Sequence, residues 1–94
     1  VDLNRPGAKT ATQTDQRTLR VTVDRYGSIF VDTRPVKPWM LQGRVRDFLS
    51  KSTVKSVLVV SDERVHTGKL VHIVDQCRMA GADQVGVAVN QEVE

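Results

Sequence analysis

The stretch that decides the fold is Val57-Leu-Val-Val-Ser-Asp-Glu-Arg-Val-His-Thr-Gly-Lys-Leu-Val-His-Ile-Val-Asp-Gln-Cys-Arg-Met-Ala-Gly-Ala-Asp-Gln-Val-Gly-Val-Ala-Val89. Its first four residues form an uninterrupted apolar run, which is typical of a covered strand. Apolar residues then recur at helical spacing, at positions 70, 73, 74 and 77, and Gly81 stands where a helix often ends. Valine alternates with smaller residues from Val85 to Val89. The stretch therefore predicts a strand, a helix and a second strand, joined by a right-handed crossover that makes the two strands parallel.

The preceding residues predict a hairpin and another helix. Leu19 to Asp24 alternates apolar with polar residues, Ser28 to Asp32 is again largely apolar, and Gly27 between them suits a turn. Pro38 suits a first helical position, and an apolar stripe at helical spacing follows it: Leu41, Val45, Phe48 and Leu49. We expect an α+β two-layer sandwich in the order β-β-α-β-α-β. Its mixed four-stranded sheet, with room for a fifth strand, would carry both helices on one face.

The other face of this sheet is expected to be open. Its side chains would be Arg20, Thr22, Asp24, Gly86 and Ala88. An RNA-recognition motif needs aromatic residues on such a face for base stacking, and the only candidates here are Phe30 and Tyr26. The Gly-x-x-Gly loop of a KH domain is absent as well. Both RNA-binding folds are therefore disfavoured.

The chain is long enough for one domain. Between Asn4 and Thr18 no apolar residue is larger than Ala, so this segment cannot bury enough surface to offset its ordering entropy. We expect residues 1–18 to be a flexible tether and residues 19–94 to be the folded domain. The sequence starts at Val and contains no apolar run near the ~20 residues that a membrane helix needs, so we expect it to be a fragment of a longer protein.

The charge is unevenly distributed along the chain. The formal net charge is +3, but residues 37–55 carry +4 and residues 56–94 carry −3. A duplex-binding protein more often shows one contiguous basic face. A stand-alone nucleic-acid module is therefore the least favoured hypothesis, and no nucleic-acid partner is expected.

The loop before the second predicted helix carries the side chains that could support catalytic or metal-binding chemistry. Thr67-Gly68-Lys69 lacks the upstream glycine and the following Ser or Thr of a phosphate loop, so it is better read as a helix start capped by Thr67. Asp62 and His66 share the loop with Glu63, without an evident nucleophile. His66 would lie outside the helix and His72 on its solvent side, so we expect no metal site, no cofactor and no enzymatic activity.

Two surface features allow a partner-binding interpretation. Trp39 lies off the apolar stripe of the first helix, so it either folds back over the end of the hairpin or anchors a partner. His72, Asp75 and Met79 share the outer face of the second helix. That face is either plain solvent surface or a contact surface.

In their order along the chain, these residues resemble the ExbD/TolR family. The resemblance covers residues 19–90 and rests on Val57 to Val65, Gly68 to Gly81 and Gln84 to Val89. The hairpin from Val23 to Asp32 also fits, and Val1-Asp2-Leu3 is similar to the segment that follows the family's membrane helix. The sequence departs from the family pattern at His66-Thr67, where Pro-Tyr is usual, and at Leu3-Asn4-Arg5-Pro6, where Leu-Pro is common.

The resemblance implies the periplasmic domain of a single-pass bacterial inner-membrane protein. Such a subunit works as a homodimer inside an ExbB/TolQ-like ring and uses the proton-motive force, passing motion to a TonB- or TolA-like protein that energises outer-membrane transport. Some family members, TolR especially, contact peptidoglycan and maintain the envelope, which is the alternative function. The residues expected to bind partners are Val1, Asp2, Leu3, Asp62, His66, His72, Asp75 and Met79.

Overall fold

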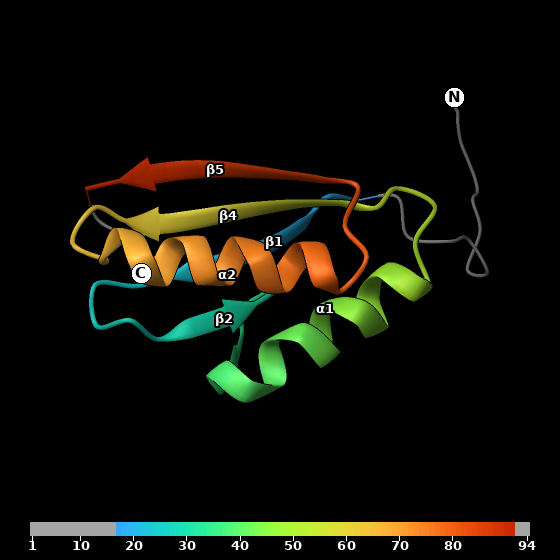
Figure 1. Cartoon of the computed structure of the whole chain (residues 1–94), viewed down its shortest axis with the longest axis horizontal. Coiled ribbons are helices and arrows are strands. Elements are labelled where there is room, and N and C mark those ends of the chain that lie inside the picture. Colours follow the sequence, from blue (N-terminus) through green and yellow to red (C-terminus); the bar gives the residue numbers. More distant parts are fainter. Residues whose placement is uncertain (1–16, 92–94) are drawn as a thin grey trace, which may run out of the picture.

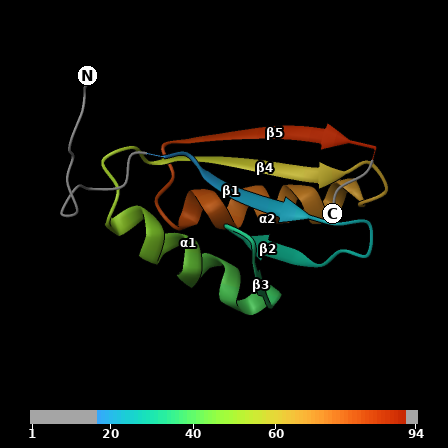
Figure 2. The same cartoon turned by 180° about the vertical axis from the view of Figure 1, so that it is seen from behind.

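A five-stranded mixed sheet forms one layer of the molecule and two helices form the other (Figures 1 and 2). The computed structural model describes residues 17–91. The strands are β1 (Leu19–Val23), β2 (Ile29–Val31), β3 (Arg34–Val36), β4 (Ser56–Asp62) and β5 (Gln84–Asn90). The helices are α1 (Leu41–Ser50), which follows the short 3₁₀ helix η1 (Pro38–Met40), and α2 (Thr67–Met79). The α+β two-layer sandwich is confirmed.

The sheet has the strand order β3-β2-β1-β4-β5. Strand β4 runs parallel to both β1 and β5, whereas β1-β2 and β2-β3 are antiparallel. The predicted strand–helix–strand unit is therefore present, with β4 and β5 as parallel neighbours. Gly81 follows α2 with a φ of 114°, a conformation that glycine adopts without steric cost.

Strand β3 was not predicted. The sequence left room for a fifth strand without placing it, and Arg34–Val36, which pairs with β2, supplies that strand. Pro35 lies opposite Phe30 on the outermost strand, where proline is tolerated because the outer edge needs no donor. A three-residue strand containing proline gives almost no periodic signal, which is why the sequence pointed to four strands.

The core lies between the helices and the inward face of the sheet. It is almost wholly aliphatic, and its most deeply buried members are Leu19, Val21, Val23, Leu41, Val45, Leu49, Val57, Val59, Ile73 and Cys77. The inward-facing residues of β1 and the stripe of α1 were both predicted from their spacing. Trp39 takes no part in this core, since 79% of its surface is exposed, and so it does not fold back over the hairpin.

The start of α2 differs from the prediction in one detail. Thr67 is the first helical residue, and the N-cap is His66, which makes no side-chain capping hydrogen bond. Among residues 17–91 no helix is both long and apolar enough to cross a bilayer. The predicted N-terminal contact residues Val1, Asp2 and Leu3 lie outside the described residues, and the tether stays a prediction.

Candidate partner-binding surfaces

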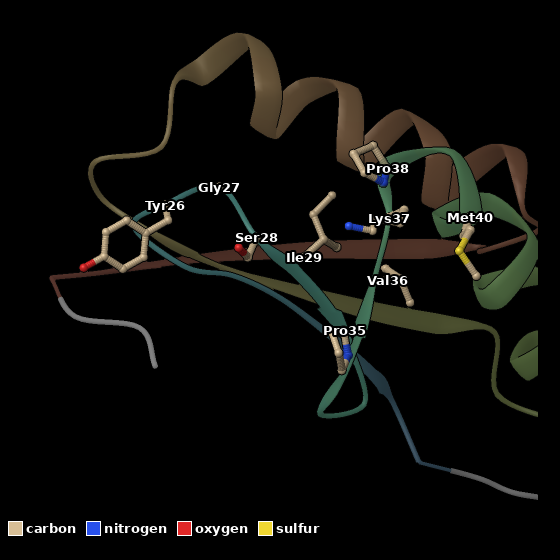
Figure 3. Close-up of a pocket in the computed structure, with 9 residues that line it drawn as sticks. All are labelled: Tyr26, Gly27, Ser28, Ile29, Pro35, Val36, Lys37, Pro38 and Met40. Carbon is tan, nitrogen blue, oxygen red and sulfur yellow. The ribbon is translucent and has the colours of Figure 1, made fainter.

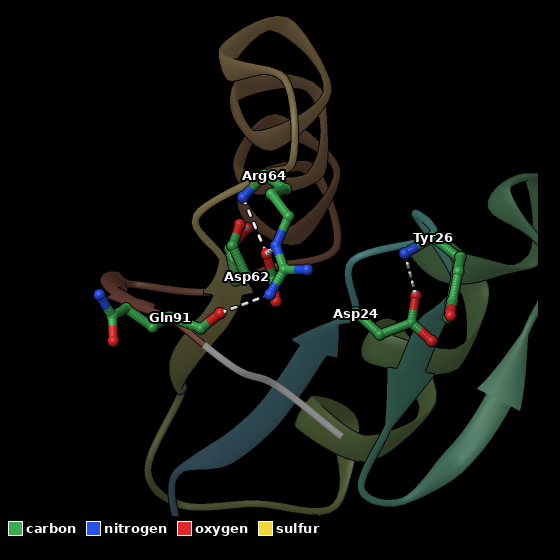
Figure 4. A network of polar contacts seen from close by, with 6 residues as sticks. Asp24, Tyr26, Asp62, Arg64 and Gln91 are labelled. Carbon is green, nitrogen blue, oxygen red and sulfur yellow. Dashed lines mark hydrogen bonds and ion pairs between the residues drawn. The ribbon is translucent and has the colours of Figure 1, made fainter.

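The loop between β4 and α2 is held by a polar network (Figure 4). Asp62 is 1% exposed, and its Oδ1 accepts hydrogen bonds from Arg64 N at 2.8 Å and Arg64 Nε at 3.1 Å. Arg64 Nη2 also donates to the carbonyl of Gln91 at 2.9 Å, which ties the loop to the end of β5. The backbone N–H of Glu63 donates to the carbonyl of Asn90 at 2.8 Å, next to that contact. Asp62 therefore orders this loop from a buried position.

The outer face of α2 gathers three of the predicted contact residues. His72 and Asp75 are exposed, and 64% of the Met79 surface is accessible. Their spacing of three and four residues places them on one side of the helix. His66 is also exposed, just before the first turn, whereas Asp62 lies buried at the strand end. The structure thus brings His72, Asp75 and Met79 together and leaves Asp62 apart from them.

Strand β5 presents an open edge that the sequence did not reveal. It pairs with β4 on one side, and no strand in the described part of the chain covers its other side. Figure 1 shows α2 in front of β1, with β4 and then β5 farther toward the top of the view. Val87 and Val89, which face the helix side, stay 47% and 57% exposed as a result. An apolar strand with unpaired backbone groups favours pairing with another chain.

A groove of about 590 Å³ lies where β2 and β3 diverge (Figure 3). Its lining residues come from the β1-β2 turn, from both strands and from η1: Tyr26, Gly27, Ser28, Ile29, Pro35, Val36, Lys37, Pro38 and Met40. This groove was not predicted because it depends on β3, which was itself not predicted. The two prolines that bracket Val36 and Lys37 are the local signal that an irregular edge begins there.

The reactive side chains do not form a cluster. Within residues 17–91 no three His, Cys, Asp or Glu side chains are close enough together to hold a metal ion. Cys77 is fully buried on α2, and this burial raises the pKa of its thiol from about 9 to about 11. A thiol with so high a pKa is mostly protonated near neutral pH and is a weak nucleophile.

The described part of the chain is thus an α+β domain with an open strand edge, an exposed helix face and an apolar groove. A family model described as "Biopolymer transport protein ExbD/TolR" matches residues 1–92, and the chain belongs to this family. It is similar to the biopolymer transport protein exbD2 of Vibrio cholerae serotype O1, with 25% identity over 91 residues. This alignment covers 97% of the chain and 68% of that protein. Family membership means that the chain is part of a bacterial membrane-associated protein. This protein is a subunit of a motor that energises biopolymer transport.

Proposed function

We propose that the chain is the periplasmic binding and force-relay domain of an ExbD-like subunit, driven by the proton-motive force, that energises outer-membrane transport. The observation that carries this proposal is the family match, which extends through the whole folded unit to residue 92. The surfaces described above are of the kind that bind other proteins. The proposed partners are an ExbB/TolQ-like ring at the inner membrane and a TonB- or TolA-like protein in the periplasm.

The position of β1 suits a relay of force from the membrane. A tether formed by residues 1–18 would enter the sheet at Leu19, at the start of β1. That strand is hydrogen-bonded on both sides, to β2 and to β4. A pull along β1 would load both ladders in shear, so that many hydrogen bonds share the force. Arg17 adds an anchor at this entry, with its guanidinium 3.6 Å from the Asp32 carboxylate and 5.8 Å from the centre of the Phe48 ring.

This proposal assigns no catalysis and no cofactor to the domain. Motion supplied at the membrane would reach the partner through contacts alone. A homodimer would place two copies of each surface together, and the open edge of β5 is the proposed place for the contact between copies. Neither ExbD-like nor TolR-like function follows from family membership by itself, so the experiment has to separate them.

The decisive experiment uses the full-length protein in cells that lack their own ExbD-type and TolR-type subunits. We expect it to restore energised outer-membrane transport. A flexible Gly/Ser insertion between Gln16 and Arg17 should abolish this activity because it slackens the tether, whereas the same insertion after Glu94 should not. Equal activity of both insertion variants would exclude a force relay through β1.

The TolR-like alternative makes the opposite prediction. A domain that anchors the complex to peptidoglycan would sediment with purified sacculi and would restore envelope integrity without restoring transport. Pelleting of the protein with sacculi, combined with absent transport, would replace the ExbD-like assignment by the TolR-like one.

A further inference from the structure

We infer that the groove between the β1-β2 turn and η1 binds an extended acidic–apolar peptide segment of a partner protein. This inference rests on the proposed function and adds to that proposal the binding surface and the chemistry of the partner. The groove takes no part in the β5 edge or in the exposed face of α2. It is an additional docking site within the same domain.

The floor of the groove is apolar and formed by the ends of two strands. Ile29 and Val36 are cross-strand partners and are only 4% and 8% exposed. Pro38 and Met40 form the side that belongs to η1 (Figure 3). Tyr26 lies at the opposite end of the groove in this view and is 78% exposed. A concave apolar floor beside an exposed aromatic ring is typical of sites that bind peptide side chains.

The rim of the groove is basic. Lys37 is one of its lining residues. The guanidinium carbon of Arg25 lies 5.0 Å from the centre of the Tyr26 ring. Lys69, on α2, approaches the lining residue Gly27, because its Nζ lies 3.3 Å from the position that a Cβ on Gly27 would occupy. One cationic side chain therefore lines the groove, and two more lie beside its lining residues Tyr26 and Gly27.

These positive charges are not neutralised within the described part of the chain. None of Arg25, Lys37 and Lys69 has an ion-pair partner among residues 17–91. Asp24 lies at the same turn, but its Oδ1 accepts hydrogen bonds from the backbone N–H groups of Tyr26 at 3.0 Å and Ser28 at 2.9 Å. Charge complementarity therefore favours an acidic ligand.

The dimensions favour an extended peptide. A volume of about 590 Å³ lies in the range of specific ligand sites. The lining residues of the groove extend from Tyr26 to Met40 (Figure 3). Successive side chains of an extended chain point to opposite sides, so apolar residues at every second position can face the floor. The acidic residues between them can then reach the basic rim.

The test is a titration of the isotope-labelled chain with a peptide of about ten residues in which Glu alternates with Val or Leu. We expect amide shifts centred on Gly27, Ser28 and Lys37, and little change at Gly81 and Gly86. Lys37→Glu and Lys69→Glu should each weaken the affinity by about tenfold, as expected from loss of a charge pair. Lys51→Glu is the matched control, because Lys51 is exposed at the far end of α1. The affinity of this variant for the peptide should equal that of the wild type.

Three companion probes decide the outcome. A peptide with Lys in place of Glu and an apolar-free polyglutamate peptide should both fail to shift the groove residues. Vesicles of anionic lipid should fail as well. Equal binding of polyglutamate, preferential binding of the vesicles, or equal affinities of Lys37→Glu and Lys51→Glu would overturn the inference. None of these results would change the outcome of the transport assay. A wrong assignment of the groove can therefore be distinguished from a wrong proposed function.

Discussion

At the scale of single residues, the turn between β2 and β3 has an unusual backbone. Its two central residues, Asp32 and Thr33, have φ angles of 50° and 73°. Positive φ at both positions is the mark of a type I′ hairpin turn, for which Asn-Gly or Asp-Gly is preferred. A β-branched residue at positive φ is a genuine outlier. The steric strain of this turn lies at Thr33, because Asp32 tolerates the left-handed region better than a β-branched residue does.

We predict that Thr33→Gly stabilises the protein by about 0.5–1 kcal/mol, because it completes the preferred Asp-Gly pair and removes the steric cost of the Cβ. Urea denaturation of both proteins measures the difference. Thr33→Ala is the matched control, since it shortens the side chain but keeps the Cβ. If Ala stabilised as much as Gly, the strain would not come from the left-handed backbone.

The Asp62–Arg64 pair gives a second prediction at this scale. Arg64→Ala should cost about 1–2 kcal/mol of stability, a figure reduced because the Arg64 side chain is 48% exposed. It removes the Nε donor from the buried carboxylate and the contact to the Gln91 carbonyl. Hydrogen exchange of the Glu63 amide, which donates to Asn90, should accelerate as well. Glu63→Ala, on the exposed neighbour, is the control and should leave the stability unchanged.

Cys77 makes the stability depend on pH in the alkaline range. Its thiol stays protonated up to about pH 11 in the folded state, whereas the unfolded thiol titrates near 9. Between these values the unfolded state binds fewer protons, so the free energy of unfolding falls as pH rises, by at most about 1.4 kcal/mol per pH unit. This stabilisation is fully present below pH 9.

The measurement compares the free energy of unfolding of the wild type and Cys77→Ala at several pH values from below 9 to about 11. All other groups are common to both proteins, so their contributions cancel in the difference. The gap between the two proteins should narrow or reverse as pH rises. A pH-independent gap would show that the thiol is not held neutral in the folded state.

At the scale of elements, periodicity predicted what depends on local sequence. The stripes of α1 and α2 and the alternation of β1 each mark one buried face, and those faces are buried in the structure. The continuous apolar run of β4 is buried on both faces, at Val57 and Val59 on one and at Val60 on the other. The shared face of His72, Asp75 and Met79 follows from the same helical spacing. Local pattern sufficed here because each element meets the core along its whole length.

The features that were not predicted from the sequence depend on how the elements pack against one another. Val87 and Val89 stay exposed on the outermost strand beyond β4, and no local pattern in β5 records that position. The groove exists only where β2 and β3 diverge, and β3 is a three-residue edge strand containing Pro35. Two of the three candidate surfaces, the β5 edge and the groove, are thus properties of packing.

At the scale of the whole molecule, the two edges of the sheet differ in their ability to pair. Strand β3 is short and carries Pro35, which cannot donate a backbone hydrogen bond. Strand β5 has seven residues, no proline, and valines on one face. Short strands and proline protect an edge against pairing, whereas a long apolar edge invites it. We therefore expect copies of the chain to associate through β5.

The prediction is that Val87→Lys combined with Val89→Lys weakens self-association by about tenfold or more while the domain stays folded. The two positions are 47% and 57% exposed, so lysine there meets solvent in the single copy but brings like charges together in a β5–β5 contact. Sedimentation equilibrium over a range of concentrations measures the association, and circular dichroism checks the fold. Tyr26→Lys is the matched control, because Tyr26 is a 78% exposed apolar residue at the β1-β2 turn, away from β5. If the control weakened association and the double variant did not, the contact between copies would lie on the hairpin side of the sheet, and β5 would be left free for a different partner.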